Sequence, residues 1–134
     1  MVVIKHYLLL EKVLADNVGV VATDVTGVGT SRRDLAATAY GGDKAIFVFG
    51  YTSVGVSMSN LVSNVGVIST DTTGVGTARW GLGGAIYGGD KGIVAFGNTG
   101  SRTNISNLIS NVGVVATDTS GVGSSREGLA GAGY

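Results

Sequence analysis

Short apolar runs separated by turn residues recur along the chain. Residues 35–40 are small and apolar, and residues 44–50 are rich in β-branched and aromatic side chains, a composition that favours strands. Between them, Gly-Gly-Asp at 41–43 supplies the positive φ angles that tight hairpins need. The pattern predicts an antiparallel hairpin over 35–50.

Two further strands are predicted after this hairpin. Residues 58–63 alternate apolar and polar side chains, and a variable loop at 51–57 precedes them. A turn at 64–66 then leads into residues 67–72, which we expect to be the fourth strand. The sequence therefore predicts an all-β fold with four short strands per unit.

These strands belong to a tandem repeat. Similar segments begin at Asn17, Asn64 and Asn111, each 47 residues after the last, and the first two units share 26 identities in 47 positions. Each unit must therefore be one structural module. We divide the single domain into a divergent segment (1–16), two repeats (17–63 and 64–110) and a partial repeat (111–134).

Four short strands with glycine-rich turns in about 47 residues are typical of a β-propeller blade. The order of elements resembles a kelch-type repeat, in which an arginine precedes the innermost strand and a second strand ends in glycine. Arg32 with residues 35–50, and Arg79 with residues 80–97, stand in that order. The glycine after the second strand is single here, and the fourth-strand tryptophan of the kelch pattern is absent. The glycine-rich repeated sequence is also similar to those of highly repetitive phage and environmental proteins.

The number of repeats predicts self-assembly. The chain supplies three blades' worth of residues, whereas propellers close with about four to eight blades. Open sheet edges promote aggregation, and a two-fold pair would remove them. We therefore expect a homodimer that closes a six-bladed ring, with residues 129–134 of one subunit pairing with N-terminal residues of the other.

The N-terminal segment gives two conflicting signals. Residues 7–15 have high helix propensity, whereas the repeat frame places strands at 1–4 and 8–14. We favour strands, because tertiary context commonly overrides propensity. Charged residues interrupt the apolar runs, so no convincing signal peptide is present and we expect a cytoplasmic or virion-associated protein without membrane contact.

Composition narrows the function classes. Nine basic and nine acidic residues balance, and charged residues make up only 13% of the chain. Nucleic-acid binding normally leaves a basic footprint, which is missing here. Low charge favours surface hidden between subunits, and the lack of cysteine excludes disulfides and thiolate metal sites.

Two charged residues recur once per repeat. Asp24, Asp71 and Asp118 are either calcium ligands or acceptors within a turn, and we favour the turn, because calcium loops gather several carboxylates. The arginines either ring an opening that binds anions or sugars, or brace neighbouring blades by donating to backbone carbonyls, which we favour. These arginines are Arg32, Arg79 and Arg126. No metal or cofactor is expected.

We expect a non-catalytic scaffold or interaction module that binds itself, because the sequence holds no catalytic constellation and His6 is its only histidine. An enzyme is the least favoured class. The alternative is a carbohydrate-binding propeller, with a glycan or a protein as ligand. Its candidate stacking and hydrogen-bonding residues are Trp80, Tyr51, Arg102 and Asn98. A tryptophan that covers a groove between blades is an equal interpretation of Trp80.

Overall fold

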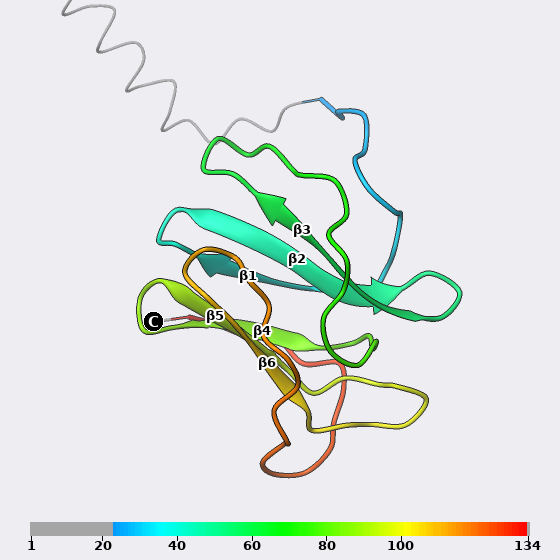
Figure 1. The fold of residues 1–134 in the computed structure, drawn as a ribbon. Helices are drawn as coiled ribbons and strands as arrows, with labels where there is room; N and C mark the ends of the chain where they lie inside the picture. Colours follow the sequence, from blue (N-terminus) through cyan, green and yellow to red (C-terminus); the bar gives the residue numbers. More distant parts are fainter. Residues whose placement is uncertain (1–22, 134) are drawn as a thin grey trace, which may run out of the picture.

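The computed structural model describes residues 23–133, and this part of the chain is all-β (Figure 1). It forms two three-stranded antiparallel sheets with strand orders β1-β2-β3 and β4-β5-β6. The strands are β1 (Ala36–Tyr40), β2 (Lys44–Tyr51), β3 (Gly55–Val62), β4 (Gly83–Tyr87), β5 (Lys91–Ala95) and β6 (Ser106–Ile109). Within these residues the structure holds no helix long and apolar enough to cross a membrane.

The predicted first hairpin is confirmed. β1 and β2 pair from Tyr40 opposite Lys44 onward, so the Gly-Gly-Asp segment forms the turn. Gly41 and Gly42 have φ angles of 60° and 81°, a left-handed conformation that glycine adopts without strain. The second sheet repeats this hairpin, with Gly88 and Gly89 at φ angles of 61° and 80°.

β3 begins earlier than predicted and shortens the expected loop at 51–57. Tyr51 pairs with Gly55, so the connection after β2 is a tight hairpin turn. An irregularity between Val48 and Gly50 shifts the register, and the buried Phe49 there has a φ of 59°. Such a bulge changes the direction of a strand. Pairing between β2 and β3 then resumes in a shifted register, with Gly50 opposite Val56.

The fourth strand predicted at 67–72 is wrong as a regular strand. This segment pairs with β3 through two isolated bridges, Val62 with Ile68 and Ser59 with Thr72, and not through a continuous ladder. Between them the Ser69 hydroxyl accepts from the Leu61 amide at 3.0 Å, in the place of a backbone carbonyl. Side-chain oxygens compete with the ladder here, so each unit has three strands and an irregular outer segment.

The two sheets pack face to face through β1, which contacts both β4 and β5. Ile46, Val48 and Phe49 of the first sheet are fully buried, as are Val94 and Ile109 of the second. β1 and β4 approach closely because the second sheet has glycine there: a Cβ on Gly84 would lie 2.4 Å from the Ala37 carbonyl oxygen. The small residues of β1 and β4 therefore allow this contact.

The 47-residue repeat is also a repeat of contacts. The Gly81 amide donates to the Asp34 carbonyl at 2.8 Å, and the Gly128 amide donates to the Gly81 carbonyl at 2.9 Å. Residues 129–133 lie along β4 as β4 lies along β1, with a Cβ on Gly83 only 3.0 Å from Leu129 (Figure 1). The strand or helix expected at 1–16, and His6, lie outside the described residues.

Candidate functional site

A hydrogen-bonded cluster built around Arg32 joins four segments of the chain around the first sheet. The Arg32 guanidinium donates to the carbonyl of Phe49 at 2.8 Å and to the Asn60 side-chain oxygen at 2.6 Å. The Asn60 amide then donates to Asp71 at 2.9 Å, and Asp71 also accepts from the Thr30 amide at 2.9 Å. One arginine thus links the segment before β1 to β2, β3 and the irregular outer segment.

The same cluster recurs around Arg79 in the second unit. Arg79 donates to the carbonyls of Phe96 at 2.9 Å and Thr77 at 3.1 Å, and to the Asn107 oxygen at 2.6 Å. Asn107 in turn donates to Asp118 at 2.9 Å. Each partner lies 47 residues after its counterpart, so the cluster is part of the repeat itself.

Arg79 also joins the two sheets. Its guanidinium carbon lies 4.3 Å from the centre of the Phe49 ring, and its carbonyl accepts from the Gly50 amide at 3.0 Å. The Arg79 side chain is fully buried, and burial lowers its pKa, although a guanidinium stays protonated at neutral pH. Arg79 therefore lies between the sheets, bonding within its own unit and stacking on the other, and its bracing role stays a prediction.

Asp71 and Asp118 each cap a glycine-containing turn. The pKa of Asp71 lies below its usual value because the Thr30 hydroxyl and the Asn60 amide stabilise the carboxylate. Partial burial raises the pKa of Asp118, but bonds from Thr77 and Asn107 outweigh this effect and hold the pKa below its usual value. Both aspartates accept from residues 41 positions earlier in the chain, so they join distant segments instead of closing a local turn as we expected.

Arg126 is the third arginine of the series, and its surroundings differ. Its guanidinium lies 3.9 Å from the centre of the Phe96 ring, matching the stacking of Arg79 on Phe49. However, the residue is exposed, and no carbonyl, asparagine or aspartate side chain among the described residues accepts from its guanidinium. Arg126 thus stacks as Arg79 does, but within the described residues its guanidinium lacks the hydrogen-bond acceptors that surround Arg79.

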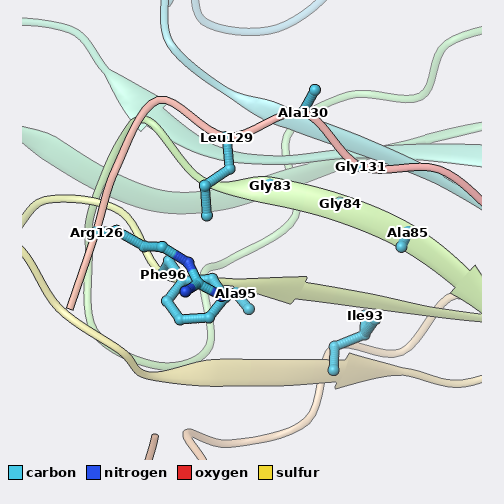
Figure 2. Close-up of a pocket in the computed structure, with 10 residues that line it drawn as sticks. All are labelled: Gly83, Gly84, Ala85, Ile93, Ala95, Phe96, Arg126, Leu129, Ala130 and Gly131. Carbon is cyan, nitrogen blue, oxygen red and sulfur yellow. The ribbon is translucent and has the colours of Figure 1, made fainter. Parts of the chain in front are cut away.

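A cavity of about 330 Å³ marks this incomplete position (Figure 2). Its walls are the outer faces of β4 and β5, the stacked Phe96 and Arg126 side chains, and the chain at 129–131. Ile93 and Phe96 are partly exposed there, whereas their repeat counterparts Ile46 and Phe49 are fully buried. We name this outer surface of the second sheet, defined by the residues that line the cavity, the open face.

The candidate ligand residues gather on one rim of the molecule. The Tyr51 and Trp80 rings meet edge to face at 4.9 Å, and Trp80 pairs through its backbone with Asn98. Asn98 pairs in turn with Arg102. The structure brings these four residues into one continuous row.

Most of this row is already engaged within the protein. Trp80 is partly buried against Gly55, where a Cβ would come within 3.1 Å of its ring. The Asn98 amide donates to Glu127 at 2.7 Å, and Arg102 donates to the same carboxylate at 3.3 Å. Trp80 therefore packs against Gly55 and Tyr51 of the first sheet, and Glu127 holds the polar part of the row together.

Sequence reasoning missed two components of the repeated cluster. Thr30 and Thr77, and Asn60 and Asn107, bond the aspartates that we singled out. Both pairs recur at the 47-residue interval, which was the available signal. Their importance was hidden because threonine and asparagine are common in turns, and recurrence alone does not tell a buried partner from a solvated one.

No protein-family model matches the chain, and no curated protein matches it. Among residues 23–133, no three histidine, cysteine or acidic side chains are grouped to hold a metal ion.

Proposed function

We propose that the protein is a non-catalytic scaffold or interaction module of the β-propeller type that assembles with copies of itself. The observation that carries this proposal is the contrast between Arg79, fully buried between two sheets, and its counterpart Arg126, exposed on the open face. The same residue types occur at both positions, so the open face fits one more sheet of the same kind. A second copy carries such a sheet.

Several features support a propeller with kelch-like blades. Consecutive sheets stack face to face, and the strand nearest the stacking contact is the first of each unit. The bonds from Gly81 to Asp34 and from Gly128 to Gly81 repeat one geometry from unit to unit, as rotation about a common axis requires. On this basis we retain the six-bladed ring of a homodimer as the preferred assembly.

Sedimentation equilibrium over a wide concentration range tests the assembly. The expected result is a mass of twice the 13.4 kDa chain, with apparent stability rising with protein concentration. A larger closed ring would keep the self-assembly and change only the blade number. A folded monomer at all concentrations would contradict the proposal.

Carbohydrate binding is the second candidate, and the row from Tyr51 through Trp80 to Asn98 and Arg102 favours it. Partly exposed aromatic edges beside an amide and a guanidinium suit a sugar ring and its hydroxyls. A glycan array probed with the assembled protein, and with Trp80→Ala as the matched control, tests this function. Signal that is lost in the variant would support it, and a silent array would remove it.

A further inference from the structure

We propose that Asp24 of one copy completes the hydrogen-bonded cluster of Arg126 in a second copy, by accepting from Ser124 and pairing with Arg126. This contact rests on the proposed self-assembly and specifies which residues meet across it. The partner is chemically defined: a carboxylate presented by the same chain, in the same turn that already binds the two internal clusters.

The two internal clusters provide the geometry of this contact. Asp71 accepts from the Thr30 amide at 2.9 Å and Asp118 from the Thr77 amide at 3.0 Å, each across 41 residues of sequence. In both cases the arginine two residues after the threonine approaches the same carboxylate at 3.8 Å. In both units, therefore, a threonine and the arginine two residues after it bind an aspartate together, and Ser124 and Arg126 have the same spacing.

The third segment of this kind, at 123–126, has the same glycine conformation, and the space beside its glycine is empty. The glycine before each hydroxyl residue is left-handed in all three units, with φ angles of 80° at Gly29, 85° at Gly76 and 87° at Gly123. A Cβ on Gly29 would lie 2.5 Å from an Asp71 oxygen, and one on Gly76 would lie 2.4 Å from an Asp118 oxygen. A Cβ on Gly123 would meet nothing within 4 Å. The backbone thus has the aspartate-binding conformation where no aspartate lies.

Asp24 is the matching free half. It occupies the repeat position of Asp71 and Asp118 and is exposed, and it forms no hydrogen bond with any other described residue. Its charge is opposite to that of Arg126, which is equally exposed. Asp24 has the same place in the 47-residue frame as the aspartates that bind Thr30 and Thr77, so the frame allows Asp24 of another copy to bind Ser124.

A backbone bond accompanies this pairing in the same frame. Asp34, Gly81 and Gly128 have φ angles of 53°, 67° and 69°, so all three present their peptide groups alike. Gly81 donates to Asp34 and Gly128 donates to Gly81, which leaves the Asp34 amide of a second copy to donate to Gly128. In the sequence, Val13 stands at the repeat position of Asn60 and Asn107, and Ser124 stands at that of Thr30 and Thr77.

Charge reversal tests the contact directly. Asp24→Arg and Arg126→Asp should each raise the dissociation constant of the assembly by at least about ten-fold, since each places like charges together. The double variant restores opposite charges and should return the constant to within about three-fold of the parent. Asp43→Arg, at an exposed hairpin turn, is the matched control and should leave assembly unchanged. Sedimentation velocity gives the constants, and circular dichroism verifies the fold of each variant.

The outcomes separate this inference from the self-assembly on which it rests. An assembly that is insensitive to Asp24→Arg, or single losses without recovery in the double variant, would overturn the Asp24 contact and leave the self-assembly intact. A parent protein that is a folded monomer would overturn both. If Asp24→Arg destabilises the monomer, Asp24 makes its stabilising contacts within its own chain, and this result also contradicts the inference.

Discussion

The inner junction, where the first sheet meets the second, and the open face of the second sheet are made of corresponding residues in different surroundings. At the junction Phe49 and Ile46 are fully buried, and Arg79 lies between the sheets with every side of its guanidinium engaged. On the open face Phe96 and Ile93 are partly exposed, and Arg126 stacks on Phe96 without the remaining partners. The comparison teaches that a repeat buries its core only when the next unit supplies the other wall.

Arginine truncation should show the largest contrast between these two regions. Arg79→Ala removes a buried charge and leaves the Phe96 carbonyl and Asn107 without their donor, so we expect a loss of about 3–5 kcal/mol in the free energy of unfolding. Arg126→Ala should lower that free energy far less and should weaken assembly instead. Urea denaturation at low protein concentration measures both, and equal losses would contradict the comparison.

Isoleucine truncation sharpens the comparison in the apolar core. Ile46→Ala opens a cavity in the inner junction and should cost about 2–5 kcal/mol of unfolding free energy. Ile93→Ala alters the same repeat position on the open face and should cost clearly less in the dilute protein. If its cost rises with protein concentration towards that of Ile46→Ala, the open face is covered by assembly.

Trp80→Arg tests how much the contact of Trp80 with the first sheet stabilises the protein. The substitution installs the residue type of the equivalent position, Arg33, and removes the edge-to-face contact with Tyr51. We expect a loss of about 1 kcal/mol in unfolding free energy, the usual contribution of such an aromatic pair. Thermal unfolding measures this loss, and an unchanged midpoint would show that the contact between Trp80 and Tyr51 does not stabilise the fold.

Acid should have the smallest effect, because the carboxylates of Asp71 and Asp118 remain partly exposed to solvent. The folded-state pKa values of Asp71 and Asp118 lie below their usual 3.8. The unfolded chain therefore binds protons first as the pH falls, and stability declines from near that value down through the lower native pKa values. Thr30→Val and Thr77→Val should flatten this decline in urea titrations between pH 7 and pH 2.5, and an equally steep decline would exclude these bonds as its cause.

Local rules predicted the hairpins and failed where side chains replaced backbone partners. The turn glycines and the β-branched run in β2 were sufficient to place β1 and β2 within one residue. The segment at 67–72 was expected to be a strand, yet the Asn60 amide donates to the Ser69 carbonyl and the Leu61 amide of β3 donates to the Ser69 hydroxyl. Such bonds depend on which residues face one another, and alternation along the sequence carries no information about them.

The candidate site divides in the same way. Recurrence identified Arg32, Arg79 and Arg126 and the aspartates at the 47-residue interval, because a repeated charge that survives in a low-charge chain needs a structural role. Recurrence did not reveal that Asn60 and Asn107 connect the two residue types. Their place in the cluster follows from β3 lying beside β2, a tertiary relationship.

The sequence by itself determined the all-β class, the 47-residue unit, the turns and the residues that recur. Period-two patterning and glycine chemistry act over a few residues, so they are legible without the fold. Only the tertiary structure decided that Arg79 is buried while Arg126 is exposed, although both occupy one position of the repeat. Burial depends on what packs against a side chain from a distant part of the chain, and identical residues therefore acquire different roles at the inner junction and on the open face.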